Sequence, residues 1–308
     1  MIQTYFLGAN SRNGFYSLYE HFPPDKNAFL HILKSGPGTG KSGFLRRIGL
    51  AAEERGLDVH YVLCSGDPDS LDGVYLPALG QAWVDGTAPH VIEPRIFGVD
   101  SNYVNLGMYL TEPFSQQEAA NLRGLNQAYK SLYHTAYRYL SQYAAVVDHS
   151  QPSGISKDEA RELLNSLSGK SESAGVSYRF LSAISCKGVL RLTEQAEKLC
   201  GKTLPTDSNT LSYISELAQS LGLQVILCPS PLDPTVLEWV LLPEDELAFS
   251  AIPPLSGDAV ACQFRSKALE ALREAKSLHD QLEAFYKEHM DFPALTAYTE
   301  RTIRELFS

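Results

Sequence analysis

The sequence lacks several features that would place it in a specialised class of protein. No uninterrupted apolar run approaches the roughly 20 residues that a membrane-spanning helix needs. The N-terminal stretch has no basic region ahead of a long apolar core, so a signal peptide is not expected. Basic residues are outnumbered, with 26 Lys and Arg against 36 Asp and Glu. This balance argues against nonspecific binding to nucleic acid or to anionic membranes.

Paired cysteines are also missing. The five cysteines form no CxxC pair and no cluster with histidine that would indicate zinc, and their odd number does not suit a disulfide framework. A reducing compartment fits this pattern better, so we expect a cytoplasmic protein in which most of the cysteines are small core residues. The scattered positions are Cys64, Cys186, Cys200, Cys228 and Cys262.

The sequence is otherwise ordinary globular material, with 44% hydrophobic and 20% charged residues over 308 positions. Its most informative stretch is 28–45, AFLHILKSGPGTGKSGFL. An apolar run predicts a strand, the glycines a turn, and the residues after Lys41 a helix, which is the order that a phosphate-binding P-loop requires. Its amides and the helix dipole would bind phosphate oxygens. The predicted binding residues are Gly36, Pro37, Gly38, Thr39, Gly40, Lys41, Ser42 and Gly43.

On these residues the chain resembles P-loop NTPases. The resemblance implies that Lys41 reaches the β- and γ-phosphates of ATP and that the Ser42 hydroxyl binds Mg²⁺. The match departs from the pattern G-x-x-x-x-G-K-[ST] at the first glycine, where Ser35 stands. Because Gly36 and Gly38 keep the turn permissive, we interpret Ser35 as a tolerated variation that alters loop conformation.

Self-comparison indicates an internal duplication. The pattern Phe-Leu-x-Ala-x-Ser-x-x-Gly at 6–14 recurs at 180–188, an offset of 174. Later blocks, including Asp-Pro at 67 and at 233, recur with an offset of 166. Matching Cys64 with Cys228 requires a two-residue gap between these blocks.

The offset of 166 predicts that the second copy has lost its phosphate loop. Residues 35–42 map onto 201–208, GKTLPTDS, where Lys41 becomes Asp207. A carboxylate at the place of the phosphate-binding lysine would repel a triphosphate. We therefore expect one nucleotide site per chain and a second copy retained for structure or regulation.

The segment between the copies is expected to be helical. Two Ser-x-x-Glu capping boxes, at Ser115 and Ser156, mark helix starts. The first helix carries leucine and tyrosine at helical spacing, which we interpret as the packing face of a helical hairpin turning at 151–154. An alternative stays open, in which this helix is a lid or docking surface whose tyrosines stack on a base while Arg123 or Arg138 reaches a phosphate.

These patterns predict an α/β fold with a P-loop NTPase-type sheet, internally duplicated and carrying helical insertions. After the second copy, a long amphipathic helix over 264–289 is expected to stop at Pro293, and a short helix ends the chain. The expected units are a P-loop nucleotide-binding unit at 1–100, a helical hairpin insertion at 101–172, a degenerate second repeat at 173–254 and C-terminal helices at 255–308.

Acidic residues near the P-loop are candidates for holding Mg²⁺. Asp85 ends the apolar run 81–84 and is the best candidate for the acid that a P-loop needs on a neighbouring strand. Three further acids follow the strand predicted at 58–64. Because Asp-Pro recurs in the second copy, we interpret Asp67 as a turn residue and leave Asp69 and Asp72 open as metal ligands or bases. For His90 and Arg95, which could approach a γ-phosphate, the sequence does not separate that role from loop solvation.

A second resemblance covers more of the chain. YFLGAN, the P-loop, DPDSLDGVYLP and VDGTAPH together resemble an uncharacterised bacterial family described as P-loop ATPases. That resemblance implies two tandem units, each with its own phosphate loop, and it covers residues 5–94 well and 179–250 more weakly. The eroded second loop is a departure that leaves one nucleotide site, at Lys41.

The leading hypothesis is an ATP-binding protein with slow Mg²⁺-dependent hydrolysis, in which Lys41 and Asp85 serve catalysis and nucleotide state alters the docking of the repeats. Two alternatives stay open. The first is a small-molecule or nucleotide kinase with the tyrosine-rich hairpin as lid and Asp67 or Asp69 as base. The second is a non-hydrolysing module that binds a protein partner. GTP is disfavoured because no N/T-K-x-D motif is present. A homo-oligomer could supply an arginine in trans.

Overall fold

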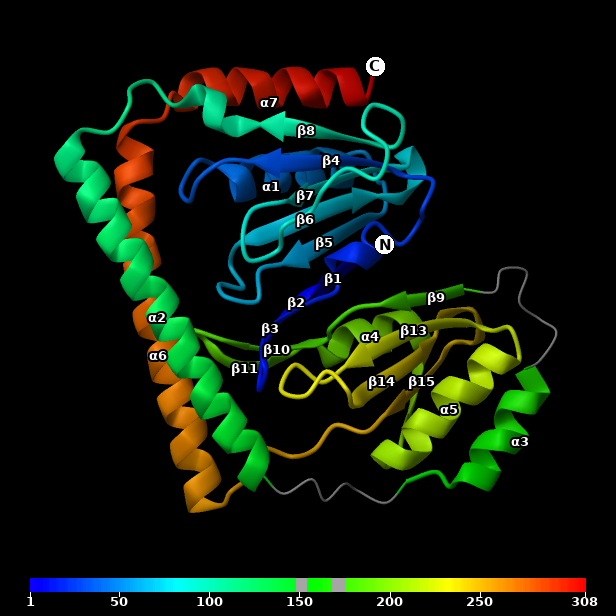
Figure 1. Ribbon diagram of the computed structural model, residues 1–308. Helices are drawn as coiled ribbons and strands as arrows, with labels where there is room; N and C mark the ends of the chain where they lie inside the picture. Colours follow the sequence, from blue (N-terminus) through cyan, green and yellow to red (C-terminus); the bar gives the residue numbers. More distant parts are fainter. Residues whose placement is uncertain (148–153, 168–174) are drawn as a thin grey trace.

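The computed structural model describes residues 1–147, 154–167 and 175–308. Two α/β units lie one above the other in Figure 1, and two long helices, α2 (Gln116–Val146) and α6 (Ala259–Glu288), run along one side of both. The expected α/β class is therefore confirmed. Among the described residues, no helix has the length and apolar character needed to cross a bilayer.

The first unit is built on a six-stranded sheet in the order β1-β5-β6-β7-β4-β8. Strand β6 is antiparallel to both of its neighbours, whereas β4 is parallel to β7 and to β8. Side chains of helix α1 (Lys41–Glu53) and of the C-terminal helix α7 (Phe292–Leu306) share one hydrophobic core with the sheet. The strands are β1 (Ile2–Phe6), β4 (Phe29–Lys34), β5 (Val59–Leu63), β6 (Leu71–Leu76), β7 (Gln81–Asp85) and β8 (Ser101–Asn105).

The second unit has a five-stranded sheet in the order β12-β15-β14-β13-β9. Helices α3 (Lys157–Leu167) and α5 (Ser208–Ser220) pack together on it, and α4 (Thr193–Cys200) lies against β12, β14 and β15. The strands are β9 (Gly175–Tyr178), β12 (Lys202–Pro205), β13 (Gln224–Pro229), β14 (Leu237–Leu242) and β15 (Leu247–Ser250). Short 3₁₀ segments are η1 (Tyr19–His21), η2 (Pro77–Leu79), η3 (Leu106–Tyr109) and η4 (Pro243–Asp245).

The two sheets share one topology. Strands β9, β13, β14, β15 and β12 follow the spatial order and relative directions of β1, β5, β6, β7 and β4. Each unit also has a small hairpin, β2–β3 (Gly8–Ser11, Gly14–Ser17) or β10–β11 (Ser182–Ser185, Gly188–Arg191). The chain is therefore internally duplicated in structure as in sequence.

The units meet at equivalent residues. Phe6 and Phe180 exchange backbone hydrogen bonds of 3.0 and 2.8 Å, and the Asn10 side chain donates to the carbonyl of Ile184, 174 positions later, at 2.8 Å. Contacts between a residue and its own counterpart are what a two-fold relation between the copies produces.

The predicted gap between Cys64 and Cys228 was wrong. Both β5–β6 and β13–β14 carry a bulge, at Val62/Leu63 and at Cys228/Pro229, so the offset of 166 continues unbroken. The residue equivalent to Cys64 is Ser230, since Cys64 N donates to Ser70 O at 3.1 Å and Ser230 N donates to Val236 O at 2.8 Å. The sequence comparison matched two cysteines that occupy different places.

The second copy does not contain an eroded phosphate loop, because the loop itself is missing. Strand β12 occupies Lys202–Pro205, within the octapeptide that we had mapped onto the loop, and only two residues separate it from α5. The second of them, Asp207, caps the helix by accepting from the amides of Asn209 and Thr210 at 2.9 and 3.0 Å. The Asp207 carboxylate thus occupies the N-terminus of α5, the place where a bound phosphate would have to lie.

The predicted helical hairpin is not formed between α2 and α3. Helix α2 packs along α6, with Tyr129 against His279 at one end and Tyr139 under Lys267 toward the other, so the two helices are antiparallel. Helix α3 packs on α5 of the second unit instead. The predicted turn at 151–154 lies mostly outside the described residues. We call α2 and α6 together the helical arm.

The sequence predicted the helix starts more accurately than the boundaries of the units. Both capping boxes form, with Ser115 paired to Glu118 and Ser156 paired to Glu159. Pro293, expected to stop the long helix, instead lies in the first turn of α7. Strand β8 belongs to the first sheet although it lies beyond residue 100, and α7 packs on the first unit although it follows the second.

A buried histidine of the first sheet makes stability depend on pH. His60 contacts Tyr5 and Tyr75 edge-on, and burial, helped by nearby Arg179, lowers its pKa from 6.5 to about 3. The folded state therefore keeps His60 neutral while the unfolded chain takes up a proton as pH falls below 6.5. We expect the free energy of unfolding to fall by about 2 kcal/mol between pH 6.5 and about pH 4.5 from this residue.

Urea unfolding of the wild type and of His60→Phe over this pH range tests the assignment. The phenyl ring keeps both aromatic contacts but cannot be protonated, so its pH dependence should be shallower by that amount. Equal slopes in the two proteins would show that His60 does not contribute.

Candidate functional site

The glycine-rich loop lies between β4 and α1, as the sequence predicts. Gly40 precedes the helix with a φ of +92°, in the left-handed region that favours glycine. The Thr39 hydroxyl donates to Gly36 O at 2.9 Å and lies 2.6 Å from the Ser35 hydroxyl. Ser35, which departs from the motif, therefore helps to close the loop through its side chain.

Lys41 is placed against Asp85. Its Nζ donates to Gly36 O at 2.6 Å and lies 3.5 Å from Oδ2 of Asp85, and each of these two side chains is 11% exposed. Asp85 ends β7, which runs parallel to β4, so both strands deliver their carboxyl ends to one edge of the sheet. Thr87 donates to Oδ1 of Asp85 from its amide at 2.9 Å and from its hydroxyl at 2.6 Å, which fixes the carboxylate.

The first turn of α1 contributes Ser42 and Gly43. The Ser42 hydroxyl accepts from the amide of Leu71 at 2.9 Å, which ties it to the start of β6. Gly43 is exposed, and no heavy atom lies within 4 Å of where its Cβ would be. Ser42 thus faces the start of β6, while Gly43 points outward.

Two residues that the sequence left undecided, Asp72 and His90, join Asp85. One donor atom of each of the three lies within 4.8 Å of the others, and all three residues are buried. Asp72 accepts from the Tyr19 hydroxyl at 2.7 Å, and His90 Nε2 lies 3.8 Å from its Oδ2. In the sequence, the change from apolar Leu71 to acidic Asp72 could have indicated a role for Asp72. No local pattern indicates a role for His90.

Burial governs the charge of Asp72. Loss of solvation raises the pKa of this carboxyl, nearby His90 opposes the shift, and Asp85 adds to it because two like charges lie close together. A cation placed between the carboxylates would remove this repulsion and favour the charged form.

The other candidate site residues form ion pairs or hydrogen bonds outside this cluster. Asp67 pairs with Lys276 of α6 at 3.3 Å, and Asp69 pairs with Lys187 of the second unit. Arg95 donates to the carbonyls of Lys26 and Ala28 at 3.1 and 3.3 Å. Asp67 thus joins the first unit to the helical arm, Asp69 joins it to the second unit, and Arg95 supports a loop. The structure brings none of the three into the Asp72–Asp85–His90 cluster.

The outer face of the loop is covered by the C-terminal helices. A Cβ on Gly36 would lie 2.5 Å from the ring of Tyr286, and one on Gly38 would lie 2.5 Å from the carbonyl oxygen of Glu283. A Cβ on Gly40 would lie 2.7 Å from the Leu295 side chain. The glycines therefore also allow α6 and α7 to pack directly on the loop.

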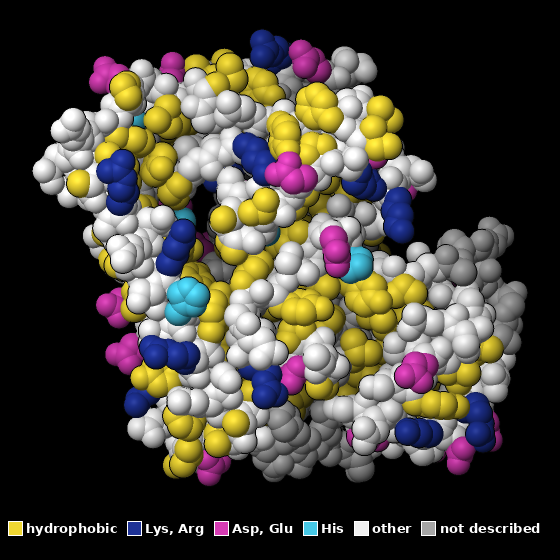
Figure 2. Space-filling view, in the orientation of Figure 1, with side chains coloured by type: hydrophobic (Ala, Val, Ile, Leu, Met, Phe, Trp, Pro, Cys, Tyr) yellow, Lys and Arg dark blue, Asp and Glu magenta, His cyan; other side chains and the backbone are white. Residues whose placement is uncertain are grey.

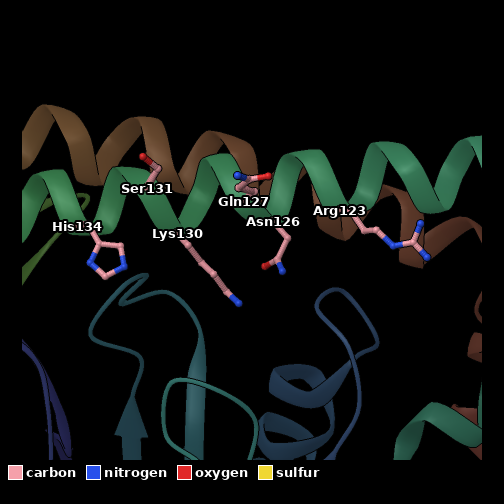
Figure 3. A pocket seen from close by; sticks show the side chains of 6 residues that line it. All are labelled: Arg123, Asn126, Gln127, Lys130, Ser131 and His134. Atoms are coloured by element: carbon pink, nitrogen blue, oxygen red, sulfur yellow. The ribbon is translucent and has the colours of Figure 1, made fainter.

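A polar stripe of α2 borders a hollow of about 470 Å³. Figure 2 shows a hollow between the helical arm and the first unit, with basic side chains on the arm beside it. In Figure 3 the side chains of Asn126, Lys130 and His134 point away from the helix, toward the side where loops of the first unit lie. The stripe consists of Arg123, Asn126, Gln127, Lys130, Ser131 and His134.

Comparison with known proteins adds no relative to this description. No family model matches the chain, and neither a curated protein nor a solved structure matches it. The function must therefore be argued from the site.

Proposed function

We propose that the protein binds ATP at residues 36–43 as a P-loop NTPase-type unit, with one site per chain. The observation that carries the proposal is the placement of Lys41 at the helix start, 3.5 Å from Asp85 at the end of the neighbouring parallel strand. A lysine for the phosphates beside an acid for the cation is the arrangement that phosphoryl chemistry uses. The missing loop in the second unit supports a single site.

The residues present fit a divalent cation as well as a nucleotide. Asp85 and the Ser42 hydroxyl would hold Mg²⁺, whose contribution when bound is to neutralise phosphate charge. Lys41 already has its ammonium in a largely buried site, so it is positioned to contact phosphate oxygens. Hydrolysis would proceed by in-line attack of water, accelerated mainly by positioning and charge neutralisation.

The packing of the loop also supports coupling between nucleotide binding and the docking of the two units. Gly36 and Gly38 touch α6, which belongs to the arm that joins the two units. A phosphate-induced change in the loop would therefore press on the arm directly. We propose that the site acts in the cytoplasm, since all five cysteines are free.

Membership of the tandem P-loop ATPase family remains part of the proposal. The two units of shared topology support it, and the absence of a second phosphate loop distinguishes this chain from what that resemblance implies.

Isothermal titration with ATP and Mg²⁺, with phosphate release followed in parallel, tests the proposal. We expect one site per chain and slow release. Two sites would contradict the structural account of the second unit, and no binding would overturn the proposal. Binding without release would favour the alternatives of a kinase or a non-hydrolysing ATP-binding module.

The α2 stripe specifically favours the kinase among these alternatives. Arg123, Lys130 and His134 make no hydrogen bond or ion pair within the described part of the chain, and they border the hollow beside the first unit. The Arg123 guanidinium and the Lys130 ammonium, free to bind an anion at that place, suit a phosphate- or carboxylate-bearing acceptor. ATP would then be consumed only when such an acceptor is added.

A further inference from the structure

Three buried donor groups converge at the carboxyl edge of the first sheet. Asp72 comes from β6, Asp85 from the end of β7 and His90 from the loop after it, and as whole residues, backbone included, they are 5%, 8% and 7% exposed. Their donor atoms lie within 4.8 Å of one another. Two donors bound to one metal ion at about 2.1 Å each are at most about 4.2 Å apart, so a small inward movement would complete a site.

His90 supplies an independent sign of a missing ligand. Its Nδ1 is buried and has no hydrogen-bond partner among the described residues, and Nε2 is 3.8 Å from Asp72, too far for a hydrogen bond. The ring is held by stacking on Tyr19 at 4.6 Å. Nε2 is the ring nitrogen that faces Asp72, and it forms no hydrogen bond among the described residues, so it is available to a metal ion.

The charges around the cluster also call for a cation. Lys41 contacts Asp85, but its ammonium also donates to Gly36 O and belongs to the phosphate loop. The Asp72 carboxylate accepts a hydrogen bond from the Tyr19 hydroxyl, and the Cys64 thiol is a second neutral donor to it. Lys41 offsets one of the two carboxylate charges, and the neutral donors beside Asp72 do not cancel the other.

We propose that, when no nucleotide is bound, Asp72, Asp85 and His90 together bind one divalent transition-metal ion, for which Mg²⁺ is a poor substitute. Mg²⁺ prefers oxygen ligands in octahedral geometry, whereas an imidazole with two carboxylates suits Mn²⁺ or Zn²⁺. Binding of the metal ion does not depend on the proposed nucleotide function. Only a role of the ion beside a phosphate rests on that function.

The second unit provides a matched comparison. Glu238 occupies in β14 the place of Asp72 in β6, and it is also buried. There the carboxylate accepts from the Ser182 hydroxyl at 2.6 Å, and Ala251 stands at the position of Asp85. Glu238 is thus a buried carboxylate without the other two ligands.

A titration of the full chain with Mn²⁺, in the absence of nucleotide and after treatment with EDTA, tests the proposal by electron paramagnetic resonance of the free ion. We expect one bound Mn²⁺ per chain, and most of it should stay bound in a 100-fold excess of Mg²⁺. Asp72→Asn and His90→Gln should each weaken binding at least about tenfold, since each removes a ligand, whereas Glu238→Gln should bind like the wild type.

Thermal unfolding with and without Mn²⁺ separates loss of the site from loss of folding. The wild type and Glu238→Gln should gain stability on adding Mn²⁺, and Asp72→Asn should unfold cooperatively without this gain. Lys41→Ala should still bind Mn²⁺ even if it binds no ATP, so failure of the nucleotide proposal would be seen separately. Absence of binding, equal affinity in the Asp72 and His90 variants, or displacement by an equal concentration of Mg²⁺ would overturn the metal proposal.

Discussion

Replacement of Lys41 by alanine is expected to weaken ATP binding at least about 100-fold, since loss of charged hydrogen bonds to phosphate amounts to about 3 kcal/mol. The ammonium is the cation that the structure places at the inner side of the loop, 2.6 Å from Gly36 O and 3.5 Å from Asp85. Without it, Asp85 would also repel the incoming phosphates. Isothermal titration of the variant with ATP gives the change in affinity directly.

Lys202→Ala is the control for this experiment. Lys202 belongs to the Gly-Lys-Thr fragment that resembles a phosphate loop, yet it is an exposed residue of β12. Its loss should leave both the affinity and the stoichiometry of ATP unchanged. A Lys41→Ala protein with wild-type affinity would refute the assignment of the site, and a loss of ATP binding in Lys202→Ala would move the site to the second unit.

The local part of the candidate site could be predicted from the sequence. The strand, the turn and the helix around residues 28–45 follow from neighbouring residues, and so does the strand that ends at Asp85. That Asp85 lies beside Lys41 depends on which strands pair, and the parallel pairing of β7 with β4 supplies it. The rule that parallel strands end at one edge was enough to anticipate this contact.

The rest of the site depends on contacts that no local pattern marks. His90 lies in a loop and reaches Asp72 because β6 and β7 are neighbours. Likewise, α6 covers the loop from more than 240 positions away in the chain. The duplication was visible in sequence, but the change of loop length between β12 and α5 was not, because an ungapped offset carries strand residues onto loop residues.

The glycines of the loop show how one pattern can serve two purposes. They match a phosphate-binding motif, and in the structure they also make room for α6 and α7. Gly38 combines a φ of +68° with a Cβ position 2.5 Å from the carbonyl oxygen of Glu283 and 2.8 Å from its Cα. Backbone atoms of a helix cannot swing aside as the end of a side chain can, so a methyl group here must displace the helix.

We therefore expect Gly38→Ala to lower the free energy of unfolding by about 2–4 kcal/mol in the absence of any nucleotide, from left-handed backbone strain together with the clash against α6.

Gly43→Ala is the matched control within the same motif, because its Cβ would meet nothing within 4 Å and it lies in the first turn of α1. That variant should be about 0.5–1 kcal/mol more stable than the wild type. Denaturant unfolding of both variants gives the two values. Equal stability of Gly38→Ala and the wild type would mean that α6 does not rest on the loop, and the route proposed from nucleotide to helical arm would be lost. The expected difference between the two variants would show that the loop carries a helix at Gly38.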